Sequence, residues 1–184
     1  MTMRRLLVLL AMWISLAANA QVVSEHDMKA AYLYNFAHLF EWPESPRANF
    51  HLCVLGDAEV GAALLRFDER RVDGKRIVIA RLSSLAPIRL CDILYVGAGE
   101  LPSLPRIRST LGSQPTLVVT DRGNLPAAGL MLDIENSRLV FDVNLEQCER
   151  TGLKAKPTLL GFARSVRRAG EAEARPLPLS QPGK

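Results

Sequence analysis

The sequence predicts an α/β fold: a single three-layer α/β/α domain with a mostly parallel sheet of about six strands and a C-terminal antiparallel hairpin. Two observations predict this class. Short apolar segments alternate with helical segments through most of the chain, which is typical of βαβ units whose parallel sheet is covered on both faces. Further on, two strand-like segments are separated by only Glu135-Asn136-Ser137, and so short a connection requires an antiparallel hairpin.

The first half begins with a helix predicted over residues 27–41, which Asp27 can cap and Pro43 cannot continue. Its apolar residues fall on more than one face, so we expect it to be buried on several sides. The elements predicted after it are strand 51–55, helix 58–66, strand 76–81, strand 92–96, helix 101–111 and strand 116–120.

The C-terminal part breaks the alternating pattern. The hairpin strands are predicted over 130–134 and 138–143, followed by a short helix over 145–151. A last helix is predicted from Pro157 to about residue 168. The α/β domain should therefore span 21–168. The segment 169–184 has little apolar content and three prolines, so we expect a disordered tail.

The N-terminus has the pattern of a secretory signal peptide. Arg4 and Arg5 precede an apolar run over 6–16, and Ala18-Asn19-Ala20 supplies small residues at a cleavage site. A spanning helix needs about 20 apolar residues, so the run is short for one, although an uncleaved anchor is the alternative. We expect residues 1–20 to be removed after Ala20 and the mature chain to be exported through the inner membrane.

The charge balance gives little sign of a nucleic-acid partner. The net charge of +4 falls to about +2 when Arg4 and Arg5 leave with the signal peptide. The remaining basic clusters, at 70–71 and 164–168, lack the interleaved aromatic residues of a nucleic-acid surface. We expect them to be solvated faces.

Three cysteines remain in the mature chain, and in an oxidising compartment two should pair. Cys53 lies within the first predicted strand and Cys91 just before the third, and the usual open α/β order makes these strands neighbours. Adjacent strands lie about 4.8 Å apart, within reach of a disulfide. We therefore predict a Cys53–Cys91 disulfide, with two buried free thiols as the alternative.

Cys148 is then left over. It lies on the short polar helix, where it is either a half-buried, unreactive thiol or an intermolecular bridge to a second chain. No cysteine or histidine spacing matches a zinc site, so no metal is expected.

Catalytic signatures are weak. The three histidines are scattered without an acidic partner at a diagnostic spacing, and no Gly-x-Ser-x-Gly elbow is present. Gly97-Ala98-Gly99 resembles the start of a dinucleotide loop, but Pro102 takes the place of its third glycine and the loop follows the wrong strand. We expect no catalytic residue and no cofactor, and a protein that is not an enzyme.

Two kinds of binding site fit the sequence. A partner protein could use the aromatic residues of the first helix and its end, because aromatic residues anchor interfaces; the candidates are Tyr32, Tyr34 and Trp42. A small ligand could instead lie at the carboxyl ends of the parallel strands, beside 56–57, 97–99 and 121–123. These segments could equally be ordinary turns.

The sequence as a whole resembles the YfiR family over most of residues 27–168. The segments that carry the resemblance, in order, are 29–37 (KAAYLYNFA), 41–43 (EWP), 52–56 (LCVLG), 72–75 (VDGK), 90–95 (LCDILY), 117–121 (LVVTD), 129–131 (GLM), 138–144 (RLVFDVN) and 152–154 (GLK). Two segments depart from the family pattern. Residues 127–129 replace paired glycines, and residues 155–158 replace a serine-containing turn.

The resemblance implies a periplasmic regulatory binding protein. Such proteins restrain a membrane-bound diguanylate cyclase through its periplasmic sensor region and so modulate cyclic-di-GMP signalling. It also implies a homodimer, a second partner in an outer-membrane-linked lipoprotein, and a structural disulfide at Cys53 and Cys91. The alternative function is a periplasmic small-ligand sensor that acts on a histidine kinase or another membrane receptor.

Overall fold

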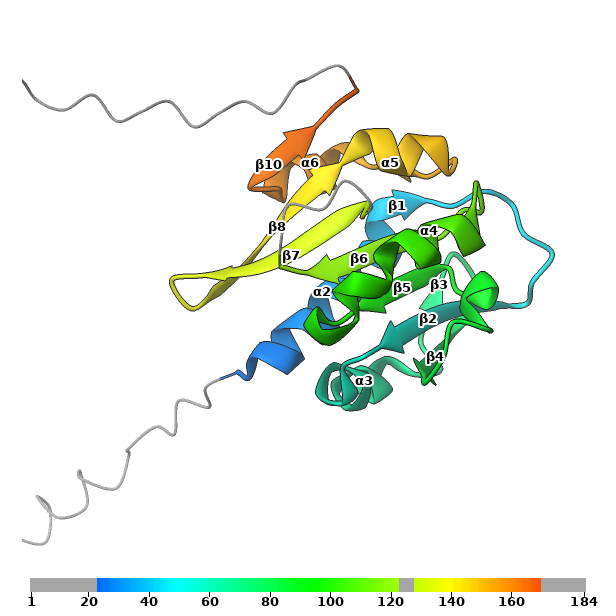
Figure 1. Ribbon diagram of the computed structural model, residues 1–184, viewed down its shortest axis with the longest axis horizontal. Helices are drawn as coiled ribbons and strands as arrows, with labels where there is room; N and C mark the ends of the chain where they lie inside the picture. The colour runs from blue at the N-terminus through cyan, green and yellow to red at the C-terminus, as the bar shows by residue number, and fades with distance from the viewer. Residues whose placement is uncertain (1–22, 123–127, 170–184) are drawn as a thin grey trace, which may run out of the picture.

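The computed structural model describes residues 23–122 and 128–169 as one α/β domain (Figure 1). The expected signal peptide (1–20) and nearly all of the expected tail (169–184) lie outside the described residues. So does Gly123, the last residue of the 121–123 segment that was considered for a ligand crevice.

An eight-stranded sheet runs in the order β10-β8-β7-β6-β5-β2-β4-β3. Its strands are β2 (Asn49–Leu55), β3 (Arg71–Val72), β4 (Lys75–Leu82), β5 (Ile93–Val96), β6 (Leu117–Asp121), β7 (Leu130–Glu135), β8 (Arg138–Asn144) and β10 (Ser165–Arg167). Only the β3–β4 and β7–β8 pairs are antiparallel. The predicted mostly parallel sheet with its C-terminal hairpin is confirmed, and two short edge strands, β3 and β10, extend the six expected strands.

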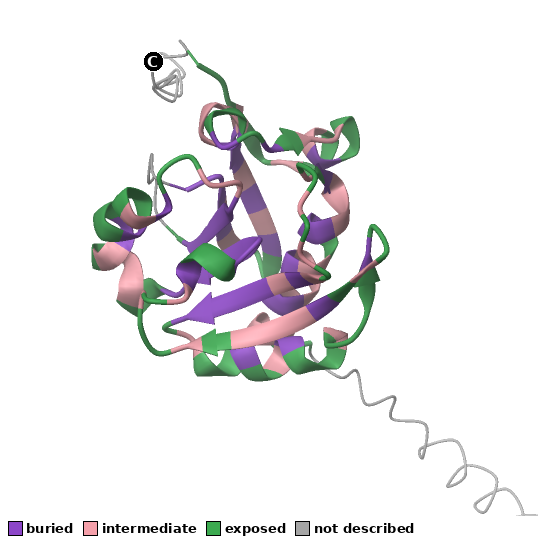
Figure 2. Ribbon diagram, turned by 90° about the vertical axis from the view of Figure 1, so that its right-hand side faces the viewer, coloured by how far each residue is buried: buried purple, intermediate pink, exposed green. Residues whose placement is uncertain are grey.

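The helices form a layer on each face of the sheet, which confirms the three-layer prediction (Figure 1). They are α2 (Glu25–Leu39), α3 (Ala58–Leu64), α4 (Leu104–Leu111), α5 (Leu145–Arg150) and α6 (Pro157–Phe162), with 3-10 turns η1 (Leu65–Phe67), η2 (Ile88–Leu90) and η3 (Ala98–Ser103). The larger core contains α2, α3 and α6, whereas α4 and η2 close a smaller core on the opposite face. Both cores bury side chains of the central strands (Figure 2).

Two predicted details of the helices were wrong. Ser24, not Asp27, caps α2, because the Ser24 Oγ accepts a hydrogen bond from the Asp27 backbone N–H at 3.1 Å. The last helix ends at Phe162 instead of residue 168. The backbone after α6 is extended, because the Arg164 N–H donates a hydrogen bond to the Phe141 carbonyl at 2.8 Å. That bond joins the segment to β8, so it continues as strand β10.

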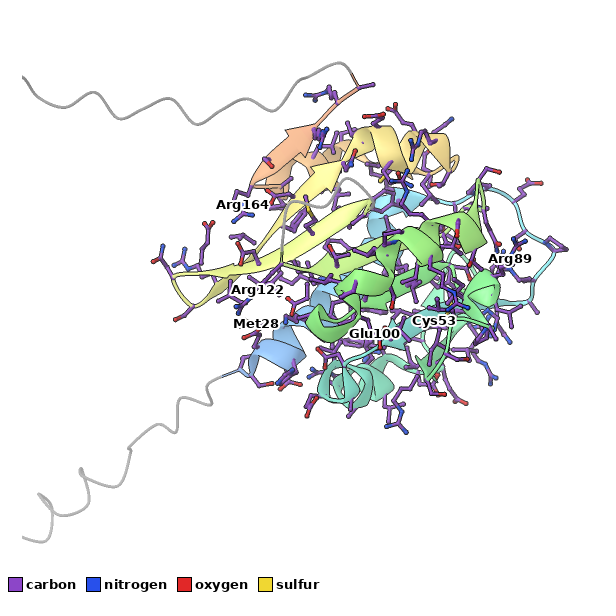
Figure 3. The ribbon with its side chains drawn as sticks, in the orientation of Figure 1. Met28, Cys53, Arg89, Glu100, Arg122 and Arg164 are labelled. Atoms are coloured by element: carbon purple, nitrogen blue, oxygen red, sulfur yellow. A yellow bond between two sulfur atoms is a disulfide. The ribbon has the colours of Figure 1, made fainter. Side chains whose placement is uncertain are left out.

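Arg164 also differs from the solvated residue that we expected. Its guanidinium forms ion pairs with Asp133, at 3.1 Å, and with Glu135 and Asp142. These carboxylates lie on β7 and β8. The arginine therefore ties the β10 segment to the hairpin (Figure 3).

A separate two-stranded sheet lies at the end of α2. It pairs β1 (Phe40–Glu41) with β9 (Lys154–Ala155) in antiparallel register. The Lys156 N–H continues this contact by donating to the Leu39 carbonyl at 3.0 Å. The pairing fixes the direction in which the chain leaves α2, and so positions Trp42.

Candidate functional site

The predicted disulfide is present between Cys53 and Cys91, with a Cα–Cα separation of 5.8 Å. Cys53 lies in β2 and Cys91 lies between η2 and β5, the strand that pairs with β2. Both residues are buried in the core on the α4 face (Figure 3). The link therefore holds η2 and the start of β5 against the middle of the sheet.

The three candidate aromatic residues lie in different environments. Tyr32 is half-buried, and its hydroxyl donates to the Leu139 carbonyl at 3.2 Å. Its ring packs edge-on against Phe36 and Phe141, with ring centroids 6.0 Å apart in both pairs. Through these contacts the Tyr32 side chain packs α2 against β8. Phe36 and Phe40, which lie near Tyr32 in the sequence, are buried in the larger core.

Tyr34 lies on another side of α2. Its ring stacks on Phe67 with centroids 4.5 Å apart, and it contacts the His38 ring edge-on at 4.9 Å. The Arg66 guanidinium lies 5.3 Å from the centre of the Phe67 ring, so a cation covers the neighbouring aromatic. Tyr34 therefore belongs to a small, half-buried aromatic cluster between α2 and η1.

Trp42 lines a groove at the amino ends of the parallel strands. The groove has a volume of about 190 Å³. The Trp42 Nε1–H donates to the Ala37 carbonyl at 2.8 Å, and the ring packs edge-on against Phe50 at 4.8 Å. We call this feature the Trp42 groove, and its lining residues are Trp42, Pro43, Glu44, Ser45, Arg47, Phe50, Val72, Asp73, Lys75, Asp92 and Pro115.

Hydrogen bonds anchor the loop that forms one wall of the Trp42 groove. Lys75 Nζ donates to the Ser45 carbonyl at 3.1 Å, and the Arg47 guanidinium pairs with Asp92 at 2.5 Å. The second Asp92 oxygen accepts the His51 backbone N–H at 2.8 Å. Burial raises the pKa of Asp92, although the His51 hydrogen bond and the Arg47 charge oppose the shift. The groove therefore has an aromatic floor and a fixed, charged rim.

The YfiR/HmsC-like family model matches residues 26–164, which include all of α2 but its first residue, the disulfide, the Trp42 groove and the hairpin. The chain belongs to the YfiR/HmsC-like family.

The carboxyl ends of the strands in this YfiR/HmsC-like protein are occupied by its own side chains. Lys29 of α2 reaches Asp121, at the end of β6, at 2.9 Å and Glu25 at 2.7 Å, although its side chain is only 3% exposed. Burial lowers the pKa of Lys29, but hydrogen bonds to Glu25 and Asp121 outweigh it and raise the pKa overall. An internal cation therefore lies where a bound ligand would lie in many α/β proteins.

The neighbouring strand ends are also closely packed. The Tyr95 hydroxyl of β5 lies 3.4 Å from Asp57, and burial raises the pKa of Tyr95, as do Asp121 and Asp57. Gly56 has a φ of 77°, and a Cβ atom at this position would collide with the Glu100 side chain. Two of the turns expected to line a ligand crevice, 56–57 and 97–99, therefore lie against each other, because a Cβ atom at Gly97 would also collide with the Gly56 carbonyl.

Cys148 is buried in this YfiR/HmsC-like protein, with 1% of its surface exposed. Its sulfur lies 3.8 Å from the Gly129 carbonyl oxygen, and burial raises its pKa to about 12. A thiol that is buried and protonated reacts slowly. This environment favours the unreactive thiol over the intermolecular bridge.

The three histidines lie on two different elements. His26 and His38 lie on α2 and His51 lies on β2. Within 23–122 and 128–169, no three His, Cys, Asp or Glu side chains gather as a metal site requires. No helix in the described part of the chain is both long enough and apolar enough to span a membrane.

Sequence reasoning identified Trp42 but missed Lys29, Arg47 and Asp92. For Lys29 a signal was present, because a lysine four residues after Glu25 in a mostly apolar helix indicates an ion pair. Arg47 and Asp92 are 45 residues apart and meet only through the fold. No local pattern indicates that contact.

Proposed function

We propose that the protein is a periplasmic regulatory binding protein that restrains a membrane-bound diguanylate cyclase through the periplasmic sensor region of that enzyme. It thereby modulates cyclic-di-GMP signalling without catalysing a reaction itself. The observation that carries the proposal is the family match over residues 26–164. The secretory pattern of residues 1–20 and the Cys53–Cys91 disulfide fit an oxidising compartment.

The proposal includes the processing and assembly that the family resemblance implies. The signal peptide is cleaved after Ala20, residues 21–168 form the binding domain, and 169–184 form a tail. The mature protein is a homodimer, and an outer-membrane-linked lipoprotein is a second partner. Size-exclusion chromatography with light scattering of the exported protein tests the dimer.

The mechanism requires a difference in affinity between two states of the cyclase. A regulator shifts an enzyme across a bilayer only by binding one conformation of its periplasmic region more tightly than another. A domain that is stapled by a disulfide and by internal ion pairs suits this task, because a preorganised surface loses little conformational entropy on binding.

We place the docking anchor at the Trp42 groove. Trp42 is half-buried beside an open groove, so a side chain of the partner can pack against its ring. Tyr32 and Tyr34 are already engaged by neighbouring side chains, so they offer less free aromatic surface. Tyr34 is the second candidate contact, and Tyr32 acts by holding α2 in place.

Cyclic-di-GMP measured in the host bacterium tests the proposal. Deletion of the gene should raise cyclic-di-GMP, and expression of the wild-type protein should restore the low level. Trp42→Ala should fail to restore it, and its affinity for the purified periplasmic region of the cyclase should fall by about 30-fold, the loss expected at an interface hot spot.

Two control variants separate binding from folding. Phe162→Ala removes another large aromatic side chain, one that is 74% exposed on α6 and does not line the groove, and it should restore repression fully. Glu44→Arg reverses a charge at the groove without touching the core, and it should weaken binding at an unchanged melting temperature. A wild-type protein that leaves cyclic-di-GMP unaltered would refute the proposed function.

A further inference from the structure

Helix α4 carries an arginine on each of its flanks. Leu104, Ile107 and Leu111 face the sheet and are buried, whereas Arg106 and Arg108 are exposed. Two residues of spacing rotate a side chain by about 200° around a helix, so the two arginines point to opposite sides. In Figure 1, α4 lies in front of the sheet, with α5 beyond one side of it.

Each of these arginines faces a groove that contains a second arginine. Arg106 lines a groove of about 580 Å³ together with Arg89 of η2, which is labelled in Figure 3. Arg108 lines a groove of about 230 Å³ together with Arg150 of α5. We call the surface formed by Arg89, Arg106, Arg108 and Arg150 the arginine face.

The arginine face has no acidic partners of its own. In the described part of the chain, none of its four guanidiniums forms an ion pair, whereas Arg47, Arg66, Arg76 and Arg164 all do. The lining of the two grooves includes hydroxyl and amide side chains and no carboxylate among the described residues. Glu100 only touches the rim, where it accepts a hydrogen bond from Ser103 at 2.9 Å.

The chemistry of the grooves fits carboxylates. A guanidinium binds a carboxylate through two parallel hydrogen bonds, and neighbouring hydroxyls can donate to the remaining lone pairs. No aromatic ring lines either groove, so the stacking platform that favours nucleobases is missing. A flat membrane surface would leave two concave grooves unfilled.

The scaffold fixes the backbone that carries Arg89. Ile88 is buried against the α4 core, and the Cys53–Cys91 disulfide begins one residue after η2 ends. Leu90, beside Arg89, is 57% exposed, so an apolar side chain adjoins the cationic groove. Arginines next to an exposed apolar residue are typical of a protein-binding surface, where arginine is enriched.

We propose that the arginine face docks an acidic segment of the regulated partner protein. This inference rests on the proposed function for the identity of the partner, and it adds a second contact surface that shares no lining residue with the Trp42 groove. The two arginine pairs straddle α4, so a carboxylate-rich segment that crosses the helix contacts both.

Fluorescence anisotropy with a labelled hexaglutamate peptide tests the charge recognition. The wild-type protein should bind the peptide at 50 mM NaCl and lose affinity as salt is added. R89A/R106A and R108A/R150A should each weaken binding at least tenfold. The matched control R70A/R138A removes the same charge from exposed positions outside both grooves, and it should change affinity less than twofold.

Three results would overturn the inference. One is an equal loss of affinity in R70A/R138A, which would mean that net charge alone attracts the peptide. Another is tight binding to phosphatidylglycerol vesicles without binding to the peptide, which would assign the face to lipid. The third is full repression by R89E/R106E in cells where the wild-type protein represses. That result would exclude the arginine face as a docking surface and leave the proposed function intact.

Discussion

At the carboxyl ends of β2, β5 and β6, side chains of the protein meet in ion pairs and hydrogen bonds, whereas at the amino ends the Trp42 groove is open. Open α/β sheets usually bind ligands at the carboxyl ends. In this protein Lys29 and Asp121 occupy that position instead. The difference shows that the fold class does not determine which end of the sheet is open, because here the carboxyl ends are packed and the amino ends border a groove.

The two ends also depend on different forces. The carboxyl end depends on a buried cation between two carboxylates, whose contribution comes from charge compensation at low dielectric. The amino end depends on the disulfide before β5 and on the hydrogen bonds that anchor the loop to Lys75 and Asp92. Variants that remove one force at a time should therefore affect the two ends separately.

Lys29→Met is expected to cause the largest decrease in the free energy of unfolding. The substitution leaves Glu25 and Asp121 close together without a cation, and the loss of one partner from a buried ion pair costs up to about 5 kcal/mol. Urea unfolding at pH 7 measures this change. Adding Asp121→Asn to the variant should recover part of the stability, because it removes an uncompensated charge.

The pH dependence checks the cause. The hydrogen bond from Lys29 lowers the pKa of Glu25, so the stability from Glu25 is present above its unfolded pKa of about 4.3 and is lost as the pH falls through the folded value. The destabilisation by Lys29→Met should therefore shrink below about pH 4. A constant difference between pH 3 and pH 7 would mean that packing, and not charge, closes the carboxyl end.

Loss of the disulfide is expected to decrease the free energy of unfolding somewhat less. Cys53→Ala/Cys91→Ala opens a loop of 38 residues, for which the chain-entropy relation gives about 4 kcal/mol. Dithiothreitol should destabilise the wild-type protein by a similar amount and leave the double variant unchanged. If dithiothreitol shifts both unfolding curves equally, the stability difference does not come from this bond.

The disulfide was predictable because it follows from the fold class. Once β2 and β5 are recognised as the first and third strands of an open α/β order, their adjacency brings Cys53 and Cys91 within reach. The hairpin was equally predictable from its short connection, which the structure makes with Asn136 and Ser137 at φ 49° and 61°.

The strands β1, β9 and β10 were not predictable from local pattern. Each has two or three residues, too few for a period of two to be detected. Their positions depend on partners remote in sequence, such as the carboxylates that bind Arg164. The Trp42 groove was only partly predictable for the same reason, since Trp42 was identified from its aromatic ring but its neighbours Arg47 and Asp92 were not.

The smallest decrease in the free energy of unfolding is expected from a substitution at the rim of the Trp42 groove. Asp92→Asn keeps an acceptor for the His51 N–H but places an amide N–H where a carboxyl oxygen accepts from Arg47. At acidic pH, where Asp92 is protonated, the loss of this hydrogen bond should cost about 1–2 kcal/mol. Because burial raises the pKa of Asp92, its stabilising contribution is complete below the unfolded pKa of about 3.9 and is lost as the pH rises through the folded value. The stability difference between wild type and variant should therefore decrease between pH 4 and pH 7.

Asp73→Asn is the matched control for this measurement. Asp73 lines the same groove but is exposed in the β3–β4 turn, so its substitution should change the free energy of unfolding by less than about 0.5 kcal/mol at each pH. If the Asp92→Asn difference instead grows as the pH rises, the attraction to Arg47 outweighs burial. An ion pair would then stabilise the rim of the Trp42 groove, as ion pairs stabilise the carboxyl ends. The two ends of the sheet would differ only in how open they are to a partner.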